Sequence, residues 1–319
     1  MKRRSLVALG LAAPLLPLTR YLVPGAHAEG QAEITQVVGV QNFRVGAWTV
    51  TALLDGAIPI GPGDFANLTA AEAQSFAEAA FLDSAEVMTG VNAYVLRDGT
   101  ETILVDAGGA GAFPGLGGLP VALVEAGIDP AAVTRVLLTH MHPDHIGGLL
   151  GADGAVFPNA SVHVHAAELA FWTDAEIKAQ VPEAFQPFFD LAMSVAEAYR
   201  ARIQTFSEEA DLVAGIRARA LPGHTPGHSG FQVSSGADTL LIWGDIVHVA
   251  AFQFPKPEAA IGFDVDAAAA IATRQAVMAE LAQSRVAVAG MHLPFPGIGY
   301  VSQDGDGYPL VPKPWSFSL

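Results

Sequence analysis

Apolar and polar residues alternate over short stretches in the first third of the chain, a pattern typical of strands. Residues 35–54 predict a pair of strands, and residues 91–106 predict a hairpin with a tight turn. The segment 57–68 is rich in Gly, Pro and Asn, which indicates a loop. The capping box Thr69–Glu72 predicts a helix that continues to about Phe81.

Apolar runs that are too short for helices recur through the rest of the chain and alternate with longer helical patterns. Strands are expected over 133–138, 161–165, 217–221, 229–233, 239–243 and 285–289. Helices are expected over 119–127, in the region 166–200, and from an N-cap at Asp264 to about Gln283. Strands precede helices twice along the chain, with no long linker, so we expect one domain over 29–319 made of two α/β halves packed sheet on sheet.

The stretch Thr139–His145, directly after the strand expected at 133–138, concentrates side chains that bind metal ions. It holds His140, His142, Asp144 and His145, although the whole chain has only 10 His among 319 residues. Imidazole and carboxylate are ligands that suit zinc and neighbouring divalent metals. A polar loop with incidental histidines is the alternative, but such clustering by chance is improbable, so the stretch predicts a metal site.

Three more residues of the ligand type follow directly after expected strands: His224, Asp245 and His292. A single histidine or aspartate in such a place is usually a core, surface or turn residue. Because all of them stand at strand ends, as the His140–His145 cluster does, their side chains can converge at one edge of the sheets. We therefore predict that they complete the metal site.

Composition narrows the function further. Hydrophobic residues make up 51% of the chain and charged residues 15%, so a large core is available. The net charge of −16 argues against nucleic acids and anionic membranes as partners. The absence of cysteine excludes disulfides, thiolate metal ligands and a cysteine nucleophile.

Residues 1–28 are expected to be an export signal peptide. A basic start, Lys2–Arg4, precedes an apolar stretch that is too short to span a bilayer, and Ala26-His27-Ala28 has the form of a cleavage site. The twin arginine favours the twin-arginine route, with the general route as the alternative. The sequence thus predicts a periplasmic or secreted protein without stable membrane insertion once the signal is removed.

The order His-x-His-x-Asp-His, His, Asp, His resembles the metallo-β-lactamase superfamily in its dinuclear form, from the hairpin at Val91 to His292. The resemblance implies an α/β fold, a four-layer αβ/βα sandwich, with two divalent ions, zinc being the expected metal. It assigns His140, His142 and His224 to the first metal. It assigns the remaining ligands as follows: Asp144, His145 and His292 to the second metal, and Asp245 as the bridge between both. Asp106 resembles a strand-end carboxylate that orients the ligands.

Within the superfamily the chain most resembles the methyl parathion hydrolase group, through the segments Trp243–Ala251 and Met291–Gly297. That resemblance implies cleavage of an ester, lactone or phosphotriester by a metal-bridging hydroxide, with catalytic roles for Asp144 and Asp245. It also implies a small, neutral, apolar substrate in a pocket lined by Phe113 and Trp172. The same resemblance implies a homodimer. The aromatics at 185–189 are further pocket candidates, although their helical spacing is equally typical of core.

Two other activities stay open within the superfamily. N-acyl-homoserine-lactone lactonases usually carry a Tyr three residues after the bridging Asp, where this chain has His248, a candidate substrate contact or proton shuttle. Persulfide dioxygenases share many of these residues around a single iron, but a filled His292 position makes that activity less favoured. A non-catalytic metal protein is a third class, which the full ligand set disfavours because structural sites are normally closed four-ligand cages.

Overall fold

The computed structural model describes residues 36–305 and 307–319, of which Val38–Leu319 form one compact unit. The predicted signal peptide, 1–28, lies outside the described residues. Among the described residues, no helix combines the length and the hydropathy needed to cross a membrane.

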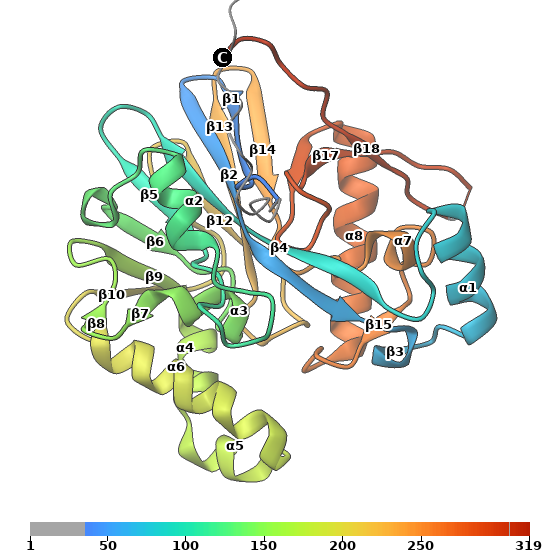
Figure 1. The fold of residues 1–319 in the computed structure, drawn as a ribbon, viewed down its shortest axis with the longest axis horizontal. Coiled ribbons are helices and arrows are strands. Elements are labelled where there is room, and N and C mark those ends of the chain that lie inside the picture. The colour runs from blue at the N-terminus through green and yellow to red at the C-terminus, as the bar shows by residue number, and fades with distance from the viewer. Residues whose placement is uncertain (1–35, 306) are drawn as a thin grey trace, which may run out of the picture. The chain divides into compact units, whose positions relative to one another are not determined.

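Two seven-stranded mixed sheets form the centre of this unit (Figure 1). The first has the order β1 (Val40–Val45), β2 (Trp48–Ile60), β4 (Val87–Arg97), β5 (Thr102–Val105), β6 (Arg135–Leu137), β9 (Ser161–His165) and β10 (Ile203–Phe206). The second has the order β11 (Ala210–Val213), β12 (Ile216–Ala220), β13 (Ser229–Ser235), β14 (Asp238–Ile242), β16 (Ala287–Ala289), β17 (Ile298–Val301) and β18 (Leu310–Pro312). In the first sheet, β5, β6, β9 and β10 run parallel to one another, and in the second sheet β14 and β16 run parallel. The other neighbours in the two sheets are antiparallel.

Helices cover the outer face of each sheet. They are α2 (Leu119–Glu125), α4 (Ala166–Trp172) and α6 (Gln186–Ala198) on the first sheet, and α8 (Ala267–Ser284) on the second. Strand alternation explains the layers, since Ile242 of β14 packs between the sheets while its neighbour Leu241 packs under α8. The predicted four-layer αβ/βα sandwich is therefore confirmed.

Most predicted elements are present, and three differ in an instructive way. The segment expected to be a loop at 57–68 begins instead with the end of β2, because residues 56–60 pair with residues 87–91 of β4 after a register shift. Asp266, rather than Asp264, caps α8, with its side chain accepting from the amide of Ala269. The capping box at Thr69 and Glu72 does begin α1 (Ala70–Ala79).

The third difference lies in the helical region 166–200, which is divided into three α-helices. Asp174 caps a separate helix, α5 (Ala175–Gln180), and Pro182 follows its end, where the missing amide prevents continuation into α6. Two more short helices border the site, α3 (Pro143–Ile146) and α7 (Ala250–Gln253). The small pairs β3 (Phe65–Ala66) with β15 (Ala260–Ile261) and β7 (Leu150–Gly151) with β8 (Gly154–Ala155) complete the fold.

Candidate metal centre

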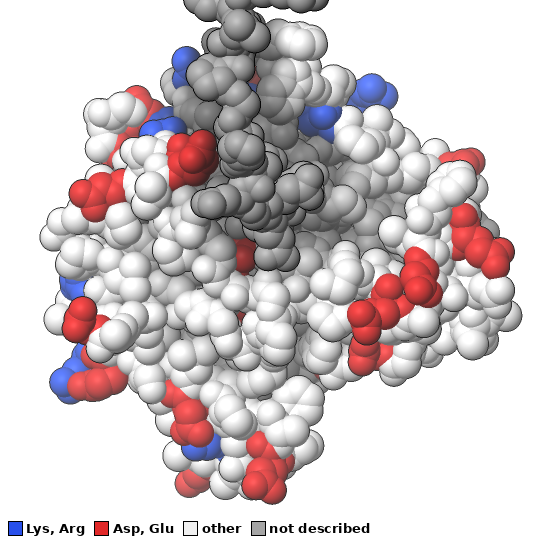
Figure 2. Space-filling model, viewed as in Figure 1, with Lys and Arg blue, Asp and Glu red and all other residues white. Residues whose placement is uncertain are grey.

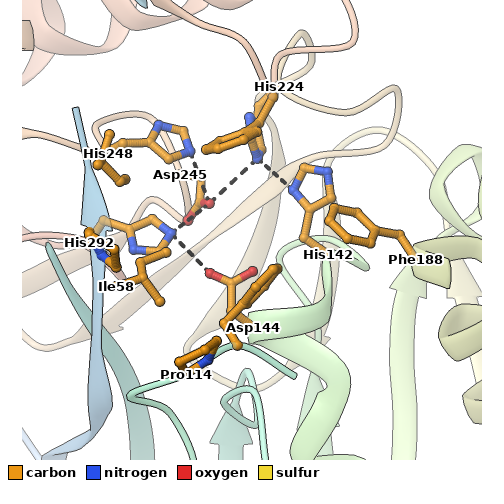
Figure 3. Close-up of a pocket in the computed structure, with 13 residues that line it drawn as sticks. Ile58, Pro114, His142, Asp144, Phe188, His224, Asp245, His248 and His292 are labelled. Carbon is orange, nitrogen blue, oxygen red and sulfur yellow. Dashed lines mark hydrogen bonds and ion pairs between the residues drawn. The ribbon is translucent and has the colours of Figure 1, made fainter. Parts of the chain in front are cut away.

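The predicted ligands converge because they leave the ends of neighbouring strands. Asp245 and His292 each stand three residues after β14 and β16, which are paired in parallel as far as Ile242 and Ala289. On the opposite sheet, the chain beyond β6 carries His140 and His142 and then enters α3. Figure 3 shows side chains from both halves turned toward one another at this edge.

Three imidazoles form the first group of ligands. Nε2 of His140 lies 2.9 Å from Nδ1 of His142, and Nε2 of His224 lies 3.2 and 3.0 Å from these two atoms. Burial lowers the pKa of all three rings well below the usual value, so they are neutral. Nδ1 of His224 lies 2.9 Å from the Asp264 carboxylate, so it carries the proton and leaves Nε2 as a lone pair.

The second group brings together Asp144, His145 and His292. Oδ2 of Asp144 lies 3.5 Å from Nε2 of His145 and 3.4 Å from Nε2 of His292. The far nitrogens of both rings are held in place, by Asp106 at 2.8 Å from Nδ1 of His145 and by the carbonyl of Gly90 at 3.0 Å from Nδ1 of His292. Asp106 thus lies in the position expected from the sequence for a carboxylate that orients a ligand.

Asp245 stands between the two groups. Its Oδ2 lies 3.6 and 3.5 Å from Nε2 of His140 and His224, and 3.3 and 3.0 Å from Nε2 of His145 and His292. Burial alone would raise the pKa of Asp245, but the neighbouring rings, His145 first, hold it well below its usual value. The carboxylate is therefore ionised and available as a shared ligand.

Unpartnered buried atoms show that these residues fit divalent cations. Within the described part of the chain, Oδ1 of Asp245 and Nε2 of His145 are buried without any hydrogen-bond partner. Such atoms are costly unless something else satisfies them. Two groups of His and Asp donors, each within 4.8 Å, are suited to divalent metals, and Asp245 also lies within that distance of His248 and His292.

Two residues behind the ligands hold them in place. Asp264, expected to be a helix cap, instead holds His224. His228 donates from Nδ1 to the carbonyl of Leu221 at 2.8 Å and accepts at Nε2 from the amide of Asp245 at 2.9 Å, which fixes the backbone of the shared ligand. The only sequence signal for His228 is its position four residues after His224.

An apolar cavity of about 270 Å³ opens above the ligands. Phe113 and Phe188 meet edge to face in its wall, with ring centroids 5.9 Å apart. None of the described residues that line the cavity is Lys or Arg (Figure 3). The lining residues besides the ligands are Ile58, Pro59, Ile60, Phe113, Pro114, Phe188, His248 and Phe263.

Of the predicted pocket residues, Phe113 and His248 line the cavity, whereas Trp172 does not. Trp172 is 3% exposed and lies behind the ring of His142, with centroids 5.2 Å apart. Its indole nitrogen donates to Glu168 at 2.6 Å. Among the aromatics at 185–189, Phe188 faces the cavity and Phe189 belongs to the core under α6.

Comparison with known proteins identifies the class. The family model of the metallo-beta-lactamase superfamily matches residues 88–284, and the chain belongs to this superfamily. It is therefore a metal-dependent hydrolase of that superfamily by fold and by its clusters of His and Asp.

Two solved structures are similar over most of the chain. One is described as hydrolase AbOPH in the beta lactamase superfamily, with 32% identity and a TM-score of 0.82, covering 88% of this chain and all of that one. The other is AidC, a dizinc quorum-quenching lactonase in complex with a product, with 27% identity and a TM-score of 0.82, covering 88% of this chain and 99% of that one. A probable metal-dependent hydrolase from Staphylococcus aureus shares the fold at 18% identity and a TM-score of 0.71, covering 87% of this chain and 100% of that one. No curated protein sequence matches the chain.

Proposed function

We propose that this chain is a dinuclear-metal hydrolase of small, neutral, apolar esters and lactones, with phosphotriesters as further candidates. The observation that carries the proposal is the position of Asp245, whose Oδ2 lies within 3.6 Å of ring nitrogens from both ligand groups at the floor of the cavity. A carboxylate so placed can hold two ions side by side. AidC, which is dizinc, supports zinc as the metal.

Each predicted ligand has a distinct role in this proposal. His140, His142 and His224 would hold one ion, and Asp144, His145 and His292 the other, with Asp245 common to both. When bound, such an ion pair supplies Lewis acidity and a hydroxide nucleophile at neutral pH. Asp144, which lines the cavity, would accept the proton of the attacking hydroxide and pass it to the departing alkoxide or phenolate.

The cavity itself favours a neutral substrate. Because no Lys or Arg is among its described lining residues, a substrate carboxylate or phosphate monoester would find no partner beyond the metals. The edge-to-face pair of Phe113 and Phe188 offers an aromatic wall for an aryl or other apolar group. The resemblance to the methyl parathion hydrolase group supports the same substrate chemistry.

Among the described residues that line the cavity, His248 is the one polar group outside the predicted ligand set. Its Nε2 lies 3.3 Å from Oδ2 of Asp245, while its Nδ1 is buried and has no hydrogen-bond partner among the described residues. We propose that the His248 ring, which lines the cavity, contacts the substrate. Gln253 accepts from the amide of His248 at 2.6 Å and so holds this turn in place.

An N-acyl-homoserine-lactone lactonase is the second candidate, and the similarity to AidC favours it. The His248 position separates the two, because lactonases of that kind usually carry Tyr there. His248→Tyr should therefore raise the rate on an acyl-homoserine lactone relative to an aryl ester. A lower rate on both substrates would count against the lactonase alternative.

Polyanions are unsuitable partners. Acidic side chains are prominent on the visible face, around α1 and at the end of the α5–α6 region (Figure 2), and the chain has a net charge of −16. Such a surface repels nucleic acids and anionic membranes. We also propose that the protein acts in the periplasm or outside the cell, on the basis of residues 1–28, and that it forms homodimers, on the basis of its resemblance to the methyl parathion hydrolase group.

Hydrolysis of a substrate panel tests the proposal. The zinc-reconstituted chain would be assayed on an aryl ester, an aromatic lactone, an acyl-homoserine lactone and methyl parathion. We expect turnover of the first two, and its loss in His140→Ala and Asp245→Ala. Matched controls are His165→Ala and Asp153→Ala, which lie outside the metal groups. A fully metallated chain that hydrolyses no member of the panel would refute the proposed function.

A further inference from the structure

Glu168 is a completely buried carboxylate in the first turn of α4 that is not one of the predicted ligands. Oε1 accepts from the amide of Met141 at 2.9 Å and from the indole of Trp172 at 2.6 Å. Oε2 accepts from the hydroxyl of Thr225 at 2.7 Å and from the amide of Gly227 at 2.9 Å. All four partners donate, which is the arrangement that an ionised carboxylate satisfies.

The positions of these donors relate Glu168 to the first metal group. Met141 stands between His140 and His142, whereas Thr225 directly follows His224. These two ligand segments come from different sheets, after β6 and after β12, and are 84 residues apart at His140 and His224. One side chain therefore bonds to both segments that must meet around a single ion.

Two further contacts show how closely this arrangement is built. A Cβ on Gly227 would lie 2.4 Å from the amide nitrogen of Glu168, so only glycine allows this approach. Trp172, which donates to Glu168, also packs its ring 5.2 Å from that of His142. Through Trp172, Glu168 thus also supports the ring of His142.

We propose that Glu168 is a positioning residue that sets the spacing of His140 and His142 against His224, and so determines the affinity of the first metal group. The inference rests on the metal site proposed above. It assigns Glu168 no contact with substrate or with the reacting atoms, and it explains why Trp172 lies behind His142 instead of in the cavity.

Glu168→Gln is the first variant to test it. Glutamine has the same shape as glutamate, but only one of its two terminal groups is an oxygen acceptor. Its NH2 group would face the two donors that now bond the second carboxylate oxygen. We expect the zinc affinity of the first metal group to fall about 10–100-fold, the range typical when residues that hold metal ligands are changed. The measurement is competition with a chromogenic chelator, together with the visible spectrum of the cobalt-substituted protein. Glu176→Gln, an exposed first-turn glutamate on α5, is the control and should bind zinc as the wild type does.

Thr225→Val is a milder second variant in case Glu168→Gln does not fold. It removes one donor to Glu168 without adding bulk. Thr173→Val is its matched control, since the hydroxyl of Thr173, at the end of α4, bonds only the carbonyl of Leu169 among the described residues. We expect weaker zinc binding in Thr225→Val and unchanged binding in Thr173→Val.

Folded Glu168→Gln or, failing that, Thr225→Val protein with wild-type zinc affinity and cobalt spectrum would overturn the proposal. That result is distinct from failure of the proposed function, in which the wild-type chain itself would not bind two ions or would not hydrolyse the panel.

Discussion

Oδ2 of Asp106 lies 2.8 Å from Nδ1 of His145, and the same carboxylate accepts from the amide and the hydroxyl of Thr139 at 2.8 and 2.7 Å. Asp106 thereby connects His145, of the second metal group, to Thr139, which directly precedes His140 of the first group. It follows β5 directly and adopts a left-handed conformation with φ of 57°. Asparagine tolerates that conformation, so a conservative variant can test the contact.

Asp106→Asn should weaken the second metal group about 10–100-fold, because the neutral amide holds the His145 ring less firmly. Zinc affinity, measured by chelator competition, checks this. Asp129→Asn is the control, since Asp129 only caps a short helix turn through the amide of Ala131. Equal zinc affinity in both variants would contradict the role given to Asp106.

Phe188→Ala should raise the KM for an aryl ester about 2–10-fold, because an aromatic contact of about 0.5–1.5 kcal/mol is lost from the cavity wall. Metal content should not change. A small aliphatic ester serves as the internal control, since it does not depend on the ring contact. If KM rose equally for both esters, Phe188 would not be an aromatic wall of the substrate site.

Arg274→Met should destabilise the protein by about 3–5 kcal/mol, because it removes the buried cation beside Asp264 and the donor to three buried carbonyls. The Arg274 side chain is 1% exposed, lies 3.8 Å from Asp264, and donates to the carbonyls of Ile246, Pro257 and Ala259. Urea unfolding measures the change. The exposed Arg200, paired only with Glu197, provides the control Arg200→Met, which should shift stability by no more than about 0.5 kcal/mol. Similar losses in the two variants would contradict this account.

His163 should make stability depend on pH. Burial, with a smaller effect from Arg135, lowers its pKa from 6.5 to about 4 in the folded chain. Between these values the unfolded chain binds a proton that the folded chain does not, so stability falls as pH drops from 6.5 toward 4. Urea unfolding of the metal-free protein at both ends of this window should show a smaller fall in His163→Gln than in wild type. An equal fall would show that His163 is not the responsible group.

The sequence located the candidate ligands better than the residues that hold them in place, for a physical reason. His140, Asp245 and His292 stand at strand ends, and strand ends can be located from short apolar runs. Glu168 and Asp264 act through tertiary contacts with residues 27 and 40 positions away, and no local pattern reveals such partners.

The same limit explains the errors in the fold and the pocket. The end of β2 was predicted as a loop because its glycine and proline content hides a pairing that only β4 provides. Trp172 was expected in the cavity only through the resemblance to the methyl parathion hydrolase group, and no local pattern reveals that its ring packs behind His142 and donates to Glu168. The layers, in contrast, followed from the order of strands and helices.

The metal content of the purified, fully folded chain tests the central claim most directly. Inductively coupled plasma mass spectrometry should find close to two divalent ions, expected to be zinc, per chain. His292→Ala should reduce this toward one, because it removes a ligand of the second group. A single iron per chain in the wild type, with no ester or lactone hydrolysis, would contradict the dinuclear hydrolase and favour a mononuclear-iron enzyme of the persulfide-dioxygenase type.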